Sequence, residues 1–375
     1  MKFLNLIQVI TSILIIKSKI IQLSYEEMSN SYDVKLTISS KLKYFAIELA
    51  QGFSFISSGY YKKGAETIIV EKGTRNFFSY PDISYELLSD IVEFGNPNVV
   101  LSDFFFYYFL PEQQPLPFDS ISLNFKHNKS FSVIENLYSK QIIDERTFSL
   151  VYFKENRGFL FLGGIPSTHT VDKYSGSCTV DSRYESWGCQ IKKVLFNKKE
   201  NTINNGYFYL QSTQWGMSVP KNFLTFLNET YLSQYFEKGN CWFHEVIDID
   251  NYHNIETVCK CFVFTNAPNF TFFIGNLKLN VDPTILFQYM SDNCRFVVKE
   301  NLNDDSFILG MSFMRQFPIL FDYDNQKLTF YSHNQINYIN LGNFSSKTLI
   351  LLNCILLSIS LLFWIFVKIR KFYNL

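Results

Sequence analysis

Few residues in this chain combine a reactive side chain with the spacing that catalysis needs. The five histidines show neither the His-Glu-x-x-His spacing nor a pairing with Cys-x-x-Cys, so we expect no metal site and no cofactor; they stand at positions 127, 169, 244, 253 and 333. Gly163–Gly164 is not followed by Lys-Ser or Lys-Thr, which predicts a turn and not a phosphate loop. An Asp followed by Thr or Ser and then Gly occurs nowhere in the chain.

The elements that would position reactive groups are clearest at residues 307–331. Apolar residues alternate there up to a turn at Asp322–Asn325 and then resume, which predicts a strand, a crossing element and a β-hairpin. Gly310 follows an apolar pair, and Arg315 and Phe321 follow in order. This order closely resembles the carboxy-lobe signature of eukaryotic pepsin-like aspartic proteases.

Other segments extend the resemblance to roughly residues 30–335. Residues 132–167 resemble the end of the family's first lobe, residues 184–197 the strand pair that opens the second, and residues 89–96 the strand after the flap. The resemblance implies an all-β, bilobal, pepsin-like fold with a cleft between the lobes. We place the lobes at residues 23–165 and 166–337.

The family's two catalytic positions can be located by motif. Each lobe of the family supplies one Asp-Thr/Ser-Gly turn, and the two carboxylates share a proton and activate a water. In the second lobe Gln211 takes the place of the aspartate, Ser212 the second position and Thr213 that of the glycine. In the first lobe Ala50 takes the place of the aspartate and Gln51 that of the threonine, with Gly52 as the motif glycine.

Neither replacement can do the family's chemistry. Gln is neutral at every working pH, and Ala has no polar group. Glu48 is the carboxylate nearest to Ala50, but it stands earlier in the strand, and its side chain is not expected to reach the turn. The β-branched Thr213 is expected to oppose the geometry of a turn that the family builds with glycine. Tyr80 is the candidate flap tyrosine, with Tyr85 as the alternative.

The resemblance and the two replacements predict a pseudoprotease. We expect it to bind a peptide or protein in the cleft between the lobes. The alternatives are an active aspartic-type endopeptidase, if the catalytic positions lie elsewhere, and a structural surface or secretory protein. With 34 basic and 34 acidic residues the chain has no net charge, so nothing indicates a nucleic-acid partner.

Both ends of the chain indicate the secretory pathway. Residues 1–22 carry Lys2 and a short apolar run, which predicts a signal peptide, with an uncleaved anchor as the alternative. Residues 348–367 carry no charge over 20 positions, which is enough to cross a bilayer core of about 30 Å. A linker at 338–347 precedes this predicted transmembrane helix, and a basic tail at 368–375 follows it. The basic tail predicts a type I single-pass protein of the endomembrane system or cell surface.

Cysteines and glycosylation sequons agree with this location. Six of the seven cysteines precede the predicted span, and the seventh, Cys354, lies within it. The family's carboxy-lobe disulfide is similar in spacing and setting to Cys261–Cys294, which leaves Cys178–Cys189 and Cys241–Cys259 as local pairs. Four acceptor sequons begin at Asn128, Asn228, Asn269 and Asn343.

Overall fold

The computed structural model divides the chain into two compact units, residues 1–333 and 334–375, and describes only part of the first. The described residues are 19–28, 31–50, 54–56, 61–77, 80–95, 99–109, 119–124, 132–152, 157–166, 174–181, 186–247, 253–275, 277–302 and 304–332. No helix among them is long and apolar enough to cross a membrane. The predicted linker, transmembrane helix and tail lie outside the described residues.

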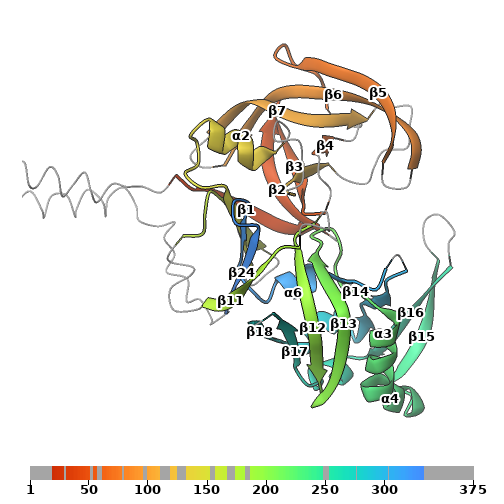
Figure 1. The fold of residues 1–375 in the computed structure, drawn as a ribbon. Coiled ribbons are helices and arrows are strands. Elements are labelled where there is room, and N and C mark those ends of the chain that lie inside the picture. Colours follow the sequence, from red (N-terminus) through yellow and green to blue (C-terminus); the bar gives the residue numbers. More distant parts are fainter. Residues whose placement is uncertain are drawn as a thin grey trace, which may run out of the picture. The chain divides into compact units, whose positions relative to one another are not determined.

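The largest sheet has 13 described strands in the order β11-β24-β23-β9-β10-β1-β2-β3-β8-β4-β7-β6-β5. Its strands are β1 (Ile21–Met28), β2 (Ser31–Ile38), β3 (Lys41–Glu48), β4 (Phe55–Ile56), β5 (Ile68–Phe77), β6 (Tyr80–Phe94), β7 (Val99–Phe109), β8 (Ser120–Ser122), β9 (Thr147–Tyr152), β10 (Arg157–Leu162), β11 (Tyr174–Thr179), β23 (Ile319–Asp322) and β24 (Lys327–Tyr331). In β2 buried residues alternate with more exposed ones, as the two-residue period of a strand requires. The long strands β5, β6 and β7 lie side by side in Figure 1.

The second lobe has two smaller sheets. A seven-stranded sheet contains β12 (Gly188–Phe196), β13 (Lys199–Leu210), β14 (Met217–Val219), β17 (Phe270–Ile274), β18 (Leu277–Val281), β21 (Val298–Glu300) and β22 (Phe307–Leu309). A four-stranded sheet contains β15 (Cys241–Ile247), β16 (His253–Lys260), β19 (Phe287–Met290) and β20 (Asn293–Phe296).

Short helices connect these strands. They are α2 (Val133–Ser139), α3 (Lys221–Leu227), the π-helix η3 (Asn228–Leu232), α4 (Ser233–Glu237), α5 (Phe262–Thr265), the 3-10 helix η4 (Pro283–Leu286) and α6 (Met311–Met314). Ser132 caps α2 by accepting a hydrogen bond from the Glu135 backbone N–H. The predicted order of strand, crossing element and hairpin over 307–331 is confirmed as β22, α6, β23 and β24.

Strands from the end of the chain complete a sheet that begins at its start. β23 pairs with β9, and β9 continues through β10 to β1. Phe148 of β9 stacks on Phe321 of β23 at 4.2 Å between ring centroids, and both contact the buried Trp187. The two lobes therefore share strands and an aromatic core, and the fold depends on residues from both.

Two sequence predictions can be judged from these elements. The three predicted disulfides are confirmed as Cys178–Cys189, Cys241–Cys259 and Cys261–Cys294. The predicted start of the first lobe at residue 23 is too late. Ile21 opens β1, pairs with Leu162 and is 2% exposed, because its side chain belongs to the core.

Candidate functional site

The second-lobe half of the site is the turn from Gln211 to Gly216, between β13 and β14. The Gln211 N–H donates to the Leu309 carbonyl at 3.1 Å, and the Met311 N–H donates to the Gln214 carbonyl at 2.8 Å. A Cβ atom at Gly310 would lie 2.2 Å from the carbonyl oxygens of both Gln214 and Gly216. Glycine is required at 310 because the backbone of the turn passes directly over it.

The first-lobe half is the end of β3 and the two residues after it. The Leu123 N–H donates to the Glu48 carbonyl at 2.9 Å, and Asn124 Nδ2 donates to the Ala50 carbonyl at 2.7 Å. Ala50 is half-buried. Gln51 and Gly52, the cleft candidates that the sequence places in the first-lobe motif turn, lie outside the described residues.

Hydrogen bonds join the two halves through side chains of the second lobe. Ser212 is fully buried, and its Oγ donates to the Ile47 carbonyl. Thr213 Oγ1 donates to Glu48 Oε2 at 3.2 Å. Gln211 Nε2 donates in turn to Thr213 Oγ1 at 3.4 Å. We call residues 47–50 and 211–216 together the floor of the site.

Two sequence-based expectations about the floor are wrong. Glu48 was expected not to reach the turn, yet its Oε1 accepts the Ala50 N–H at 2.8 Å and its Oε2 accepts the Thr213 hydroxyl. The carboxylate lies at the end of the strand and folds forward over the next two residues, so it is buried at 2% exposure. Thr213 was expected to oppose the turn. Its side chain instead makes a polar contact with the opposite lobe.

The two candidate flap tyrosines differ in what the structure describes. Tyr80 begins β6 and pairs with Phe77 across the hairpin, but its side chain lies outside the described residues. The Tyr85 hydroxyl donates to Glu71 Oε1 at 2.7 Å, and its ring lies 5.0 Å from that of Tyr107. Tyr85 thus packs against β7 and the β5–β6 hairpin.

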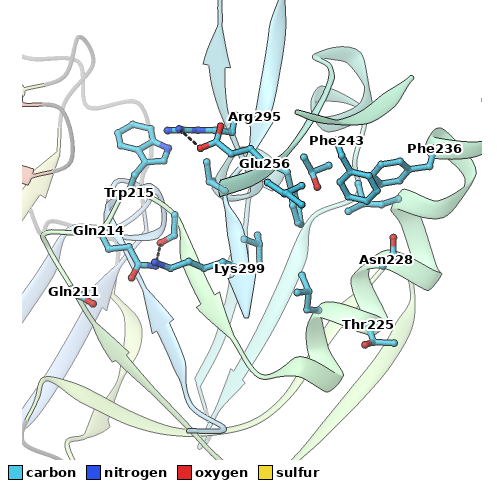
Figure 2. Close-up of a pocket in the computed structure, with 18 of the residues that line it drawn as sticks. Gln211, Gln214, Trp215, Thr225, Asn228, Phe236, Phe243, Glu256, Arg295 and Lys299 are labelled. Atoms are coloured by element: carbon cyan, nitrogen blue, oxygen red, sulfur yellow. Dashed lines mark hydrogen bonds and ion pairs between the residues drawn. The ribbon is translucent and has the colours of Figure 1, made fainter. Parts of the chain in front are cut away.

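A pocket of about 940 Å³ opens beside the floor (Figure 2). Gln211, Gln214 and Trp215 lie at one end of it, and Phe236 and Phe243 lie at the other, on α4 and β15. Phe243 is 69% exposed and Ile255 is 74% exposed, although both are large and apolar. The pocket therefore combines amide groups near the floor with exposed apolar side chains farther away.

Charged residues complete the wall of the pocket. Arg295 on β20 pairs with Glu256 on β16 at 2.9 Å, and Lys299 on β21 also lines the pocket. Sequence reasoning missed all three because they stand on separate strands and match no motif. Of the three, only Glu256 and Arg295 stand on paired strands, β16 and β20, and Lys299 belongs to another sheet, so no sequence signal indicated a shared surface.

Trp215 links the pocket to the 13-stranded sheet through Arg315. The Arg315 guanidinium lies 4.7 Å from its ring centroid and 4.5 Å from that of Tyr152. Arg315 also lies 3.7 Å from Glu27, whose pKa is raised by burial even though this positive charge opposes the shift. The buried Trp215 Nε1–H has no hydrogen-bond partner among the described residues, so it remains a donor beside the pocket.

Other predicted site residues lie away from the floor. Asn228 and Asn269 are exposed, and Asn228 also lines the pocket. Asn128 and Asn343 lie outside the described residues. Within the described part of the chain no group of three His, Cys, Asp or Glu side chains is arranged to hold a metal ion.

Comparison with known proteins agrees with this geometry. The family model of the eukaryotic aspartyl proteases matches residues 116–332, more than half of the chain. The crystal structure of an aspartic proteinase from Irpex lacteus is similar with a TM-score of 0.66, over 85% of this chain and 98% of that one. The two sequences are 11% identical, so the likeness shows the fold alone. No significant match is found among curated proteins.

Proposed function

The chain belongs to the eukaryotic aspartyl protease family, and we propose that it is a non-catalytic member that binds a peptide or protein segment against its floor and the adjoining pocket. The observation that carries the proposal is Gln211 at the end of β13. Its amide donates to the Thr213 hydroxyl, which in turn donates to Glu48 of the first lobe, and an amide cannot take a proton from water.

The floor lacks the pair of acids that the family's reaction requires. Among residues 47–50 and 211–216 the single carboxylate is Glu48. That carboxylate already accepts hydrogen bonds from the Ala50 N–H and the Thr213 hydroxyl. A proton shared between two carboxylates therefore cannot form on this floor.

The pocket supports binding of a peptide. It offers the amides of Gln211 and Gln214, the ring of Trp215 and the apolar side chains of Phe243 and Ile255. Polar groups at one end suit a peptide backbone, whereas exposed apolar groups at the other end suit apolar side chains. Arg295 and Glu256 provide paired charges at the rim.

The test is an activity and binding assay on the full-length chain. We expect no cleavage of a denatured, alkylated protein substrate between pH 3 and 7, measured by mass spectrometry of the products. Loss of a single catalytic group commonly costs several orders of magnitude in rate. A transition-state-mimicking peptide should still bind, as measured by calorimetry. Cleavage that the same peptide inhibits would contradict the proposal.

The same proposal includes the location of the protein. Three disulfides in the second lobe are typical of an oxidising compartment, which supports a luminal or extracellular position for the lobes. The uncharged segment 348–367 is proposed as the anchor in a lipid bilayer. Exposure of Asn228 and Asn269 is compatible with glycosylation.

A further inference from the structure

The two lobes repeat the same strand arrangement around the floor. In the second lobe β22 lies between β13, to which it is parallel, and β14, to which it is antiparallel. In the first lobe β8 lies between β3 and β4 in the same directions. The outer neighbours also correspond, since β14 pairs in parallel with β21 and β4 pairs in parallel with β7.

This internal repeat fixes which residues correspond. Ile308 lies between Tyr209 and Ser218, which are nine residues apart in the sequence. Ser120 lies between Ala46 and Phe55, which are also nine residues apart. Ala46 therefore corresponds to Tyr209.

Counting forward by two residues, Glu48 corresponds to Gln211. Leu49 then corresponds to Ser212, and Ala50 corresponds to Thr213. Ala50 would thus occupy the third position of the motif, that of the glycine. The motif alignment had placed it at the first position, that of the aspartate. The Ala50 N–H donates to Glu48 Oε1, which is the contact expected between the third and first residues of such a turn.

We propose that Glu48 and Gln211 form a carboxylate–amide pair where the family has its two acids, and that the Thr213 hydroxyl fills the place of the water between them. Three contacts carry this assignment. Thr213 Oγ1 donates to Glu48 at 3.2 Å and accepts from Gln211 at 3.4 Å. The Ser212 Oγ bond to the Ile47 carbonyl holds the two turns against each other.

In this arrangement a side chain of the protein itself, Thr213, occupies the centre of the floor. A hydroxyl that donates to the carboxylate and accepts from the amide satisfies both groups, as a bound water or a ligand alcohol would. Removing this hydroxyl and its methyl group would leave an acceptor and a donor facing a space with polar walls. The inference rests on the proposed function, because it concerns the centre of the same binding site.

Matched peptides and Thr213 variants test the assignment. One peptide carries a secondary alcohol in place of the scissile carbonyl, and its partner carries a methylene there. The full-length chain should bind both equally. The Thr213→Gly variant should bind the alcohol about tenfold more tightly or better, because the alcohol gains a hydrogen bond to a carboxylate. The isosteric Thr213→Val variant is the control and should show no preference, since its methyl groups fill the space.

A second substitution assigns the effect to Glu48. Glu48→Gln combined with Thr213→Gly should reduce the preference by about threefold or more, because bonds to a charged acceptor are roughly twice as strong as neutral ones. Asp103→Asn combined with Thr213→Gly should leave the preference unchanged, because Asp103 is exposed, pairs with Lys140 and is not part of the floor. Equal binding of the two peptides to a folded Thr213→Gly variant would overturn the inference, although peptide binding itself would still support the proposed function.

A crystal structure of the Thr213→Gly variant without any peptide tests the assignment of the Glu48–Gln211 pair. We expect an ordered water that bonds to both the Glu48 carboxylate and the Gln211 amide. Absence of that water, or separation of the two side chains, would overturn the assignment. If neither peptide binds any variant, the proposed function is wrong. The crystal structure would still test whether Glu48 and Gln211 form a pair.

Discussion

At the scale of single residues, three hydrogen-bonded side chains form the centre of the floor, Glu48 from the first lobe and Gln211 and Thr213 from the second. Glu48 is buried and accepts a hydrogen bond from the Thr213 hydroxyl. That hydroxyl accepts a hydrogen bond from the neutral Gln211 amide. A protease would need a second acid close to Glu48. An acid introduced at position 211 would face Glu48 from the opposite lobe, whereas an acid introduced at position 50 would lie in the same turn as Glu48.

We predict that Ala50→Asp with Gln211→Asp gives no protease. Three carboxylates would then share a buried region, and each would be destabilised by desolvation and mutual repulsion. Gln211→Asp with Thr213→Gly should instead allow Glu48 and the new acid to share a proton, giving slow cleavage of a denatured substrate at acid pH. Adding Glu48→Gln should abolish that cleavage. Robust activity of the first double variant would show that Ala50, not Glu48, occupies the acid position.

At the scale of elements, Asp90 holds the first-lobe strands together. Its Oδ2 accepts the hydroxyls of Ser39, Tyr61 and Thr67, and its Oδ1 accepts the Ile91 N–H at 2.7 Å. Burial acts to raise the pKa of Asp90, but these hydrogen bonds outweigh burial, so the pKa lies below its ordinary value of 3.8. This carboxylate within β6 thereby joins the β2–β3 turn to the segment before β5.

We predict that Asp90→Asn lowers the free energy of unfolding by about 1–3 kcal/mol at pH 7, because a neutral amide turns a donor toward three hydroxyls. The folded-state pKa is depressed, so this stabilisation is present above about pH 3.8 and is lost as the pH falls through the folded-state value. The difference between wild type and variant should shrink below that pH. Urea unfolding from pH 7 to 2.5 measures it.

Asp103 on β7 offers a matched control for this measurement. Its side chain is 54% exposed and pairs with Lys140. Solvent screens such a pair, so Asp103→Asn should change stability little at any pH. A pH-independent loss in Asp90→Asn would show that the carboxylate acts through shape and not through its charge.

At the scale of the whole molecule, sheet continuity makes the lobes interdependent. β23 and β24 come from the end of the second lobe but belong to the 13-stranded sheet, where β23 pairs with the first-lobe strand β9. Trp187 donates to the Leu123 carbonyl at 2.8 Å, and Tyr323 donates to the same oxygen. Leu123 in turn donates to the Glu48 carbonyl, so these second-lobe aromatic residues help to position the first-lobe half of the floor.

We predict that ending the chain after residue 345 releases the protein into the medium, whereas the full-length chain stays with membranes. The last described strand, β24, ends at Tyr331, so this truncation leaves every described strand intact. Residues 348–367 supply the proposed anchor. Alkaline carbonate extraction of cells and immunoblotting of the medium measure the distribution. Retention of the truncated chain in membranes would place the anchor elsewhere.

The sequence by itself determined the fold family and much of its framework. The Asp322–Asn325 turn, Gly310 and the cysteine spacing are local signals, and each reflects a requirement that neighbouring residues impose. The Asn325 N–H bonds to Asp322 Oδ1 at 2.9 Å, as such a turn requires. Gln211 was also visible in the sequence, because the second-lobe motif places it where the family has its aspartate.

The tertiary structure alone decided what happens at the centre of the floor. Glu48 and Thr213 are 165 residues apart, and no local pattern records that their side chains meet. A first-lobe motif this eroded can be aligned with its family in more than one register, whereas the strand pairing supports the register that places Glu48 opposite Gln211. The physical reason is that a side chain's role depends on which backbone lies opposite it, and that is set by pairing between distant strands and by the packing of two lobes.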